Sequence, residues 1–198
     1  MTGPPPEVRP DAVKDVNNSD VSPQIPELRE RLSDGEVELR TSTEWDIPDI
    51  LIAHQDDDEL YRRIGLSRPP TGAELGSAAE REPAERAAGT AVKLTIVEPD
   101  SDDCRGRVEV REIDWEHGAA ELGVWVAPQL RGRGVARRAL RLAAGWLFGT
   151  VGLRRLTLRT DADNVALRRA AAAAGFELVS DEPTVVMALE SDDAEHHA

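Results

Sequence analysis

The sequence predicts a mixed α/β (α+β) fold, in which helices cover the faces of a largely antiparallel central sheet. Two observations predict it. Several short segments alternate polar and apolar residues, and two longer segments repeat apolar residues with the period of a helix. These patterns are interleaved along the chain in the order β-α-α-β-β-β-α-β-α-β-β, which is typical of a sheet with helices packed on its faces.

The first half of the chain begins with the polar–apolar alternation of a strand at 36–40, after the turn residues Asp34-Gly35. Ser42 or Thr43 can cap a helix that runs to His54, and a second helical pattern covers 56–64. Residues 66–90 combine Pro, Gly, Ala and Glu with weak periodicity and predict a loop or a marginal helix. Three strands joined by turns then predict an antiparallel meander at 91–97, 107–113 and 120–126.

The second half changes its apolar period from 2 to 3.6 after Pro128. The apolar residues from Val135 to Leu147 fall on one face and predict a helix of about four turns. A second helix is predicted between a cap at Asp163 or Asn164 and the stop residue Gly175. Three short strands complete the pattern at 155–159, 176–179 and 184–189.

Length and composition indicate one domain with two tails. The chain has 198 residues, enough for a single core, which we expect at residues 25–190. Residues 1–24 are rich in Pro, Asp, Asn and Ser and predict a disordered leader, and 191–198 predict a disordered tail. We expect neither a secretory signal nor a membrane span, and the single cysteine, Cys104, indicates a reducing, cytoplasmic location.

The charge is distributed unevenly. The net charge is −14, yet residues 131–169 hold ten arginines against Asp161 and Asp163, which leaves −22 on the remainder. A nucleic-acid-binding protein presents a broad basic face, so we expect no nucleic-acid partner. One arginine block in an acidic chain indicates instead a protein that holds a small polyanion at one place.

The segment 126–136, Val-Ala-Pro-Gln-Leu-Arg-Gly-Arg-Gly-Val-Ala, lies between a predicted strand and a predicted helix. Gly132 and Gly134 let the backbone turn tightly and bring its amides close to a ligand. The helix that follows adds free N–H groups and the positive end of its dipole. The segment therefore predicts a phosphate cradle, surrounded by the guanidinium groups of Arg131, Arg133, Arg137 and Arg138.

The pattern Gln129-x-x-Gly132-x-Gly134, preceded by Val126-x-Pro128, resembles the acetyl-CoA signature of the GNAT superfamily of N-acetyltransferases. Asn164, which opens a helix that ends in Gly175-Phe176, matches the second half of that pattern in order and spacing. The resemblance covers about residues 35–189 and is closest to the subgroup that acetylates the N-terminal alanine of ribosomal proteins.

This resemblance implies a cofactor-binding set for acetyl-CoA as co-substrate. Backbone groups of Trp125 and Val126 would pair with the pantetheine arm, and Asn164 would hydrogen-bond beside it. Arg137 and Arg168 would contact the phosphate of the adenosine. The amides that would bind the pyrophosphate belong to Arg131, Gly132, Arg133, Gly134 and Val135.

The catalytic groups are less clear from the sequence. Glu121 is the candidate general base, because it shares a strand face with Gly123 and Trp125, and the alternative is a salt-bridged strand residue. Many relatives place an acid seven or three residues after the asparagine, where this chain has Ala171 and Leu167. His54 borders the expected acceptor side, as a packing residue or as part of the acceptor site. The acidic run 56–59 is either an acidic mouth for a cationic amine or a solvated helix start.

The resemblance therefore implies acetyl-CoA-dependent N-acetylation of a primary amine by direct attack in a ternary complex. The acceptor is a protein N-terminus or a small-molecule amine, no metal is expected, and a homodimer is plausible for the family. The alternative is a non-catalytic module that binds acyl-CoA or a partner and has lost its acid groups.

Overall fold

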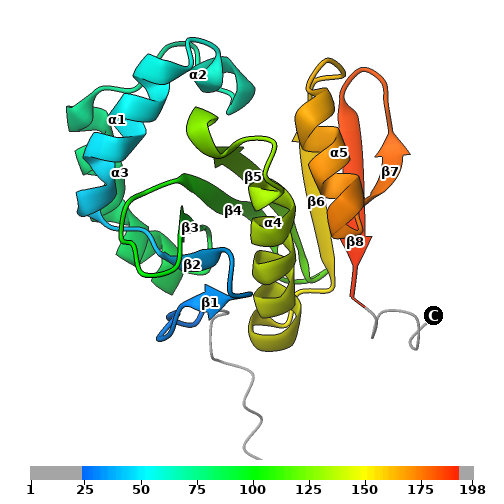
Figure 1. The fold of residues 1–198 in the computed structure, drawn as a ribbon. Helices are drawn as coiled ribbons and strands as arrows, with labels where there is room; N and C mark the ends of the chain where they lie inside the picture. The colour runs from blue at the N-terminus through cyan, green and yellow to red at the C-terminus, as the bar shows by residue number, and fades with distance from the viewer. Residues whose placement is uncertain (1–23, 192–198) are drawn as a thin grey trace, which may run out of the picture.

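The computed structural model describes residues 24–191, so the predicted leader 1–24 and tail 191–198 lie almost wholly outside the described residues. One eight-stranded sheet runs through the molecule in the order β1-β2-β3-β4-β5-β6-β8-β7 (Figure 1). All neighbouring strands are antiparallel except β5 and β6. The predicted fold class is thereby confirmed. The strands are β1 (Leu32–Ser33), β2 (Glu38–Thr41), β3 (Val92–Val97), β4 (Gly106–Asp114), β5 (Ala119–Val126), β6 (Arg155–Thr160), β7 (Glu177–Ser180) and β8 (Val185–Glu190).

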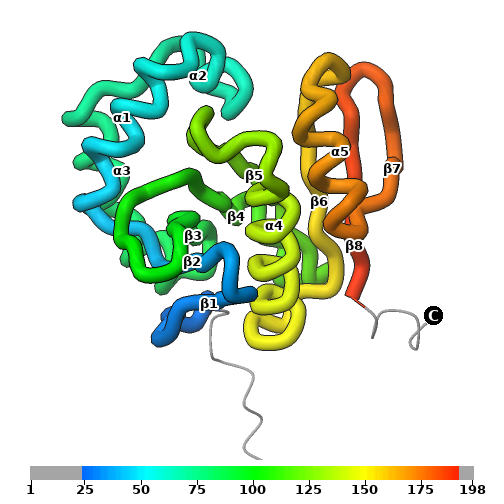
Figure 2. The backbone as a smooth tube through the Cα atoms, in the orientation of Figure 1, coloured from blue at the N-terminus to red at the C-terminus, as the bar shows by residue number. Residues whose placement is uncertain are grey.

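Two groups of helices accompany the sheet. In Figure 1, α4 and α5 lie in front of it, α1 and α3 lie at the upper left, on the side of β2 and β3, and α2 lies at the top of the view. The smooth trace of Figure 2 shows the α1–α2 segment arching over the chain that leaves β5. The α-helices are α1 (Ile47–Asp56), α2 (Leu60–Arg63), α3 (Gly72–Ala87), α4 (Val135–Trp146) and α5 (Val165–Ala174). Shorter turns are the 3-10 segments Glu44–Asp46 and Pro128–Leu130 and the π-helical turn Leu147–Val151.

Helix α3 occupies the region that the sequence predicted as a loop or a marginal helix. Its start is fixed by a capping box, in which Thr71 Oγ1 accepts from the Glu74 amide and Glu74 Oε2 accepts from the Thr71 amide. None of its residues is buried, and Pro83 lies inside it. A helix that buries no residue shows no clear apolar period, which explains why the pattern was weak. The second predicted helix, 56–64, is reduced to the single turn of α2.

The core lies between the sheet and helices α4 and α5. On β3 to β6 the even-numbered residues point into this core, for example Leu94, Val108, Leu122 and Leu158, all of which are fully buried. Side chains alternate along a strand, so the odd-numbered residues of the same strands lie on the opposite face. That second face carries most of the charged side chains of β4, β5 and β6.

The parallel strands β5 and β6 part company halfway along their length. Their last paired residues are Leu122 and Leu158. Beyond that point β5 continues for four residues to Val126, and β6 continues to Thr160. The two facing strand edges are therefore left without a partner strand, and the sheet opens into a V.

A buried carboxylate anchors the start of α1 to the sheet and so fixes the helices that border the V. Asp46 is 1% exposed, pairs with Arg40 of β2, and accepts hydrogen bonds from Thr95 Oγ1 at 2.6 Å and from the Thr43 amide at 3.0 Å. Ser42 Oγ lies 2.8 Å from Thr95 Oγ1 and completes the network. Because every oxygen of the carboxylate is paired, the charge is tolerated in the interior.

We expect Asp46→Ala to lower the free energy of unfolding by about 3–5 kcal/mol, because it removes the buried carboxylate that pairs with Arg40 and accepts from the Thr95 hydroxyl. Denaturant unfolding followed by circular dichroism measures the change. The control is Glu44→Ala, two residues away on an exposed position. Equal stability of the two variants would show that the Asp46 network does not hold α1.

Candidate functional site

The opening between β5 and β6 is a pocket of about 480 Å³. The end of β5, the loop after it, the first turn of α4, one face of α5 and helix α2 surround it. Its walls are apolar near the sheet and cationic toward the loop. The residues that line it include Leu60, Ile64, Val124, Val126, Leu130, Leu167 and Ala170 on the apolar side, and Arg63, Arg131, Arg137 and Arg169 on the cationic side.

The loop from Arg131 to Val135 forms one end of this pocket with its backbone. Gly132 and Gly134 adopt φ angles of 76° and 78°, in the left-handed region that other residues rarely enter. Gly134 is the N-cap of α4, so the first amides of that helix have no partner within it. These N–H groups, with the positive end of the helix dipole, form a site that suits a phosphate.

Arg137 provides an independent sign that this end of the pocket fits an anion. Its Nε is buried and has no hydrogen-bond partner among residues 24–191. Its guanidinium lies over the loop, with Nη2 3.8 Å from the position that a Cβ on Gly134 would take. Within the described part of the chain, no carboxylate lines the pocket. Four guanidiniums, free amides and an orphaned donor therefore fit a polyphosphate with an apolar arm.

The free edge of β5 presents Val124 and Val126 to the pocket. The Ala127 amide donates to the Arg105 carbonyl beside β4 at 2.8 Å, whereas the Val126 carbonyl accepts from Arg131 Nε at 2.9 Å. Successive residues of a strand point their backbone groups to opposite edges. The backbone N–H and C=O of Trp125 therefore face β4, and those of Val124 face the opening. The pairing with an extended ligand that the sequence assigned to Trp125 and Val126 is thus offered by Val124 and Val126.

The α1–α2 turn is tied to the cradle loop, a connection that the sequence did not predict. Gln129 Nε2 donates to Asp56 Oδ2 at 2.6 Å, and Arg131 Nη2 lies 2.6 Å from Asp57 Oδ2. Helix α2, which carries the only tyrosine, forms part of the pocket wall through Leu60, Arg63 and Ile64, although it lies far away in the sequence. Two residues of the acidic run 56–59, Asp56 and Asp57, therefore have partners within the protein.

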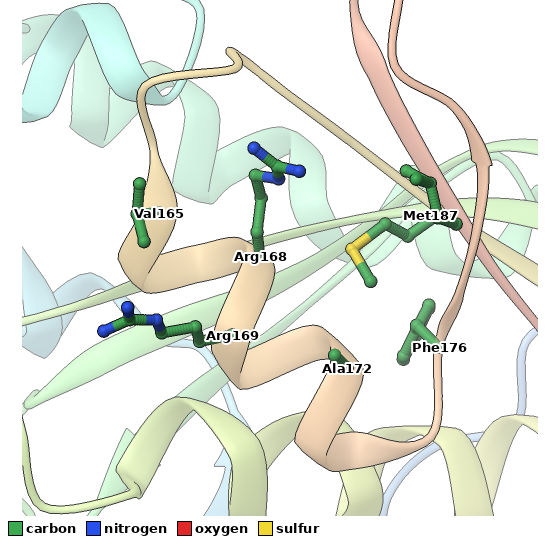
Figure 3. Close-up of a pocket in the computed structure, with 7 residues that line it drawn as sticks. Val165, Arg168, Arg169, Ala172, Phe176 and Met187 are labelled. Atoms are coloured by element: carbon green, nitrogen blue, oxygen red, sulfur yellow. The ribbon is translucent and has the colours of Figure 1, made fainter.

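Two of the predicted arginines point elsewhere. The side chain of Arg133 lines a separate polar hollow against α1, although its amide still belongs to the loop. Arg168 donates to the Ala162 carbonyl at 3.1 Å and borders an apolar hollow on the far side of α5. Figure 3 shows Arg168 and Arg169 leaving α5 in different directions. Arg169 borders the same hollow, but unlike Arg168 it also lines the pocket beside the cradle.

Asn164 lies at the pocket, as the sequence analysis expects, and it also caps α5. Its Oδ1 accepts from the Leu167 amide at 3.2 Å, and its Nδ2 donates to Thr160 Oγ1 at 3.0 Å. The two positions at which relatives carry an acid supply none here, since Leu167 is an apolar lining residue and Ala171 is fully buried in the core.

Glu121 lies on the second face of the sheet, beside Gly123, as its strand position predicts. Its side chain is 6% exposed, and Oε1 accepts from Arg111 Nη2 at 2.6 Å while Oε2 accepts from Arg159 Nε at 2.7 Å. With both oxygens engaged by guanidiniums, the geometry favours the alternative role of Glu121, an ion-paired strand residue.

Neither Cys104 nor His54 lines the pocket. Burial raises the pKa of the Cys104 thiol to about 11, so it is protonated at neutral pH. Burial lowers the pKa of His54, and the nearby Asp57 carboxylate opposes that effect.

Among residues 24–191, no helix is both long and apolar enough to cross a membrane.

We expect Asp57→Asn to lower the free energy of unfolding by about 1 kcal/mol at pH 7, through loss of the ion pair with Arg131. Burial by itself raises the pKa of Asp57, but Arg131 and the Glu59 amide outweigh it and hold the pKa below its ordinary value. The contribution is therefore present above the unfolded-state pKa and lost as pH falls through the folded-state pKa. The deficit of the variant should shrink below about pH 4.

Thermal or denaturant unfolding across this pH range measures the deficit. Asp58→Asn, on the exposed neighbouring position, is the matched control. A deficit that does not change with pH would contradict the ion-pair origin.

Comparison with known proteins identifies the family. Residues 36–177 match the acetyltransferase (GNAT) domain model. The chain is 36% identical over 69 residues to spermidine N(1)-acetyltransferase of Escherichia coli K12, a match that spans 35% of this chain and 37% of the relative. Ribosomal-protein-S5-alanine acetyltransferase from Vibrio fischeri superposes with a TM-score of 0.73 at 16% identity, covering 83% of this chain and 98% of that one.

Spermidine N-acetyltransferase from Vibrio cholerae, solved with CoA and spermine, gives a TM-score of 0.67 at 17% identity over 78% of this chain and 95% of that one. At such low identity these structures establish a shared fold. The family model, which covers most of the described residues, carries the assignment: the chain belongs to the GNAT acetyltransferase domain family.

Proposed function

We propose that the protein is an acetyl-CoA-dependent N-acetyltransferase that acts on a primary amine, either a protein N-terminus or a small molecule. The observation that carries the proposal is the pocket at the opening of β5 and β6. It joins an unpaired strand edge, a glycine-rich anion cradle and four guanidiniums in one continuous space of about 480 Å³. A space lined in this way suits a polyphosphate joined to an extended arm whose amides can pair with the strand edge, and CoA has that chemical form.

The residues have distinct proposed roles. The amides from Gly132 to Val135 and the side chain of Arg137 would hold the pyrophosphate, and Arg169 would contact the adenosine end. The backbone of Val124 and Val126 would pair with the pantetheine amides, once Arg131 releases the Val126 carbonyl. When bound, acetyl-CoA supplies the thioester that an amine attacks.

Direct transfer in a ternary complex is supported by the lining of the pocket, which among residues 24–191 includes no thiol, hydroxyl or imidazole side chain. The single cysteine, Cys104, is buried outside the pocket with a raised pKa, so no acyl-cysteine route is available to it. The protein's part is then to position the two substrates and exclude water, and orientation alone contributes a large share of such rate enhancements. Ala171 and Leu167 add no proton donor.

Titration calorimetry with acetyl-CoA, followed by thiol release against amines and N-terminal peptides, tests the proposal. We expect Gly134→Trp to abolish CoA binding, because its indole enters the cradle and its backbone must leave the left-handed region. Gly145→Trp, an exposed glycine on the same helix with open space around it, is the control. Unchanged affinity in the Gly134 variant would overturn the cradle assignment.

The alternative function, a non-catalytic acyl-CoA-binding module, is favoured by the missing acids at positions 167 and 171. It predicts CoA binding that depends on Gly134 but no thiol release with any amine. A solvent-protonated thiolate is a tolerable leaving group, since thiols have a pKa of about 8.5, so lack of a side-chain acid does not by itself stop turnover.

Glu121→Gln separates two roles for this residue. If Glu121 is an ion-paired strand residue, the variant amide keeps only one of the two arginines as a charge-assisted partner, and we expect kcat and CoA affinity to change little. If Glu121 is instead the general base, kcat falls and the acid limb of its pH profile disappears. Steady-state kinetics across pH, with saturating acetyl-CoA, distinguish these outcomes.

A further inference from the structure

An acceptor would reach the apex of the V from the second face of the sheet, opposite α4 and α5, where the side chains of Arg111 and Arg159 are partly exposed. At the apex, Gly123 of β5 and Arg159 of β6 are the first residues beyond the last pair of the two strands, Leu122 and Leu158. Helices α4 and α5 fill the other face. A pantetheine arm that ran along β5 from the cradle toward Leu122 would end at this apex. Its acyl end would then lie next to the second face of the sheet.

Guanidiniums dominate this face beside the apex. Arg111 of β4 lies directly over Gly123, because a Cβ on that glycine would lie 3.1 Å from Arg111 Nη1. Arg159 lies on the other strand at the same level. Glu121 joins both arginines through its two carboxylate oxygens, at 2.6 and 2.7 Å. The pair therefore stands on either side of the path to the apex, held in place by one buried carboxylate.

The charges at this place do not cancel. Arg107, Arg111 and Arg159 share the face with Glu109 and Glu121. The side chains of Arg111 and Arg159 are 39% and 55% exposed, whereas that of the shared Glu121 is 6% exposed. Arg111 also lies 3.7 Å from the 38% exposed Glu109, so Arg159 is the guanidinium whose ion-pair partner is buried. Arg107 Nε is buried without a hydrogen-bond partner among the described residues. Its unused donor adds to the cationic character.

Of the acidic run 56–59, which would favour a polycation, Asp57 and Glu59 are paired with arginines, whereas the exposed Asp58 has no ion pair among the described residues. Asp56 accepts from Gln129, Asp57 pairs with Arg131, and Glu59 pairs with Arg62 and Arg63. A polyamine approaching the apex would meet two exposed guanidiniums. An acceptor that carries a carboxylate near its reacting amine would instead gain charge-assisted hydrogen bonds from them.

Resting on the proposed acetyl transfer, we propose that the acceptor carries a carboxylate within one or two residues of its reacting amine, and that Arg111 and Arg159 bind that carboxylate. Two sources share this chemistry. A free α-amino acid has the carboxylate one carbon from the amine, and a peptide N-terminus has it on an acidic second residue. Glu121 acts as the positioning residue that aims both guanidiniums.

Matched acceptors test the proposal on the full chain with acetyl-CoA. Three peptides that differ only in their second residue, Glu, Gln or Lys, are compared with spermidine, and glycine is compared with glycinamide. We expect kcat/KM to be about tenfold higher for the Glu peptide or for glycine than for the uncharged partner, with the Lys peptide and spermidine lowest. The preference should shrink as salt is raised.

A binding measurement accompanies the kinetics, with the protein saturated with CoA and titrated with the same peptides in a calorimeter. We expect Arg159→Gln to remove the preference for the Glu peptide in both measurements while CoA affinity is unchanged. Arg155→Gln is the matched control, because Arg155 lies on the same strand and face but away from the apex, paired with Glu190. Arg111→Gln is the second variant, should Arg159→Gln fail to fold.

The outcomes separate the two levels of the proposal. Equal rates and affinities for the Glu and Gln peptides, with glycine no better than glycinamide, overturn the carboxylate assignment and leave acetyl transfer intact. Highest activity on spermidine does the same. Loss of the preference in Arg155→Gln as well shows a general charge effect and also overturns it. Absence of both CoA binding and thiol release overturns the proposed function, and this inference with it.

Discussion

The end of the parallel ladder at Leu122 and Leu158 is the constraint on which the site depends. Backbone N–H and C=O groups require partners, and beyond this pair the facing edges of β5 and β6 have none within the sheet. In the described chain, the Val126 carbonyl is satisfied by the side chain of Arg131, which in turn pairs with Asp57. At this position the edge has a side chain as its partner in place of a strand, and the proposed extended ligand with amide groups would replace that side chain.

This exchange links the strand edge to the helices above it. Arg131 belongs to the cradle loop, while Asp57 belongs to the turn between α1 and α2. Asp46 fixes the start of α1 against β2 and β3, and α1 in turn sets the position of the turn between α1 and α2. The ion pair of Arg131 with Asp57 thus connects the loop that is proposed to hold the pyrophosphate to the turn before α2, whose residues line the pocket. Rigid support of this kind is what preorganises a binding site.

The sequence predicts features that are local, and it fails where a neighbour decides. The loop 131–135 can be predicted from the sequence, because the residues that make its turn and those that begin the next helix lie within a few positions of one another. Arg168 and Arg169 differ by one step of a helix, so only the packing of α5 decides which of them faces the pocket. The edge that Val124 presents likewise depends on which strand lies beside it. Helix α3 buries no residue, so its apolar periodicity in the sequence is weak. Helix α2 reaches the site only because the chain folds back, since it lies far from the other pocket residues in the sequence.

The charge pattern shows the same limit and carries a further consequence. The ten arginines between residues 131 and 169 look in the sequence like one basic block, but the fold divides them between two faces of the sheet. Arg131, Arg137 and Arg169 surround the cradle, whereas Arg159 lies on the opposite face and shares Glu121 with Arg111. Two separate cationic surfaces thus meet at the apex of the V. In the proposals above, the first surface would hold the phosphates of the co-substrate, and the second, which Arg111 of β4 completes, would hold a carboxylate of the acceptor.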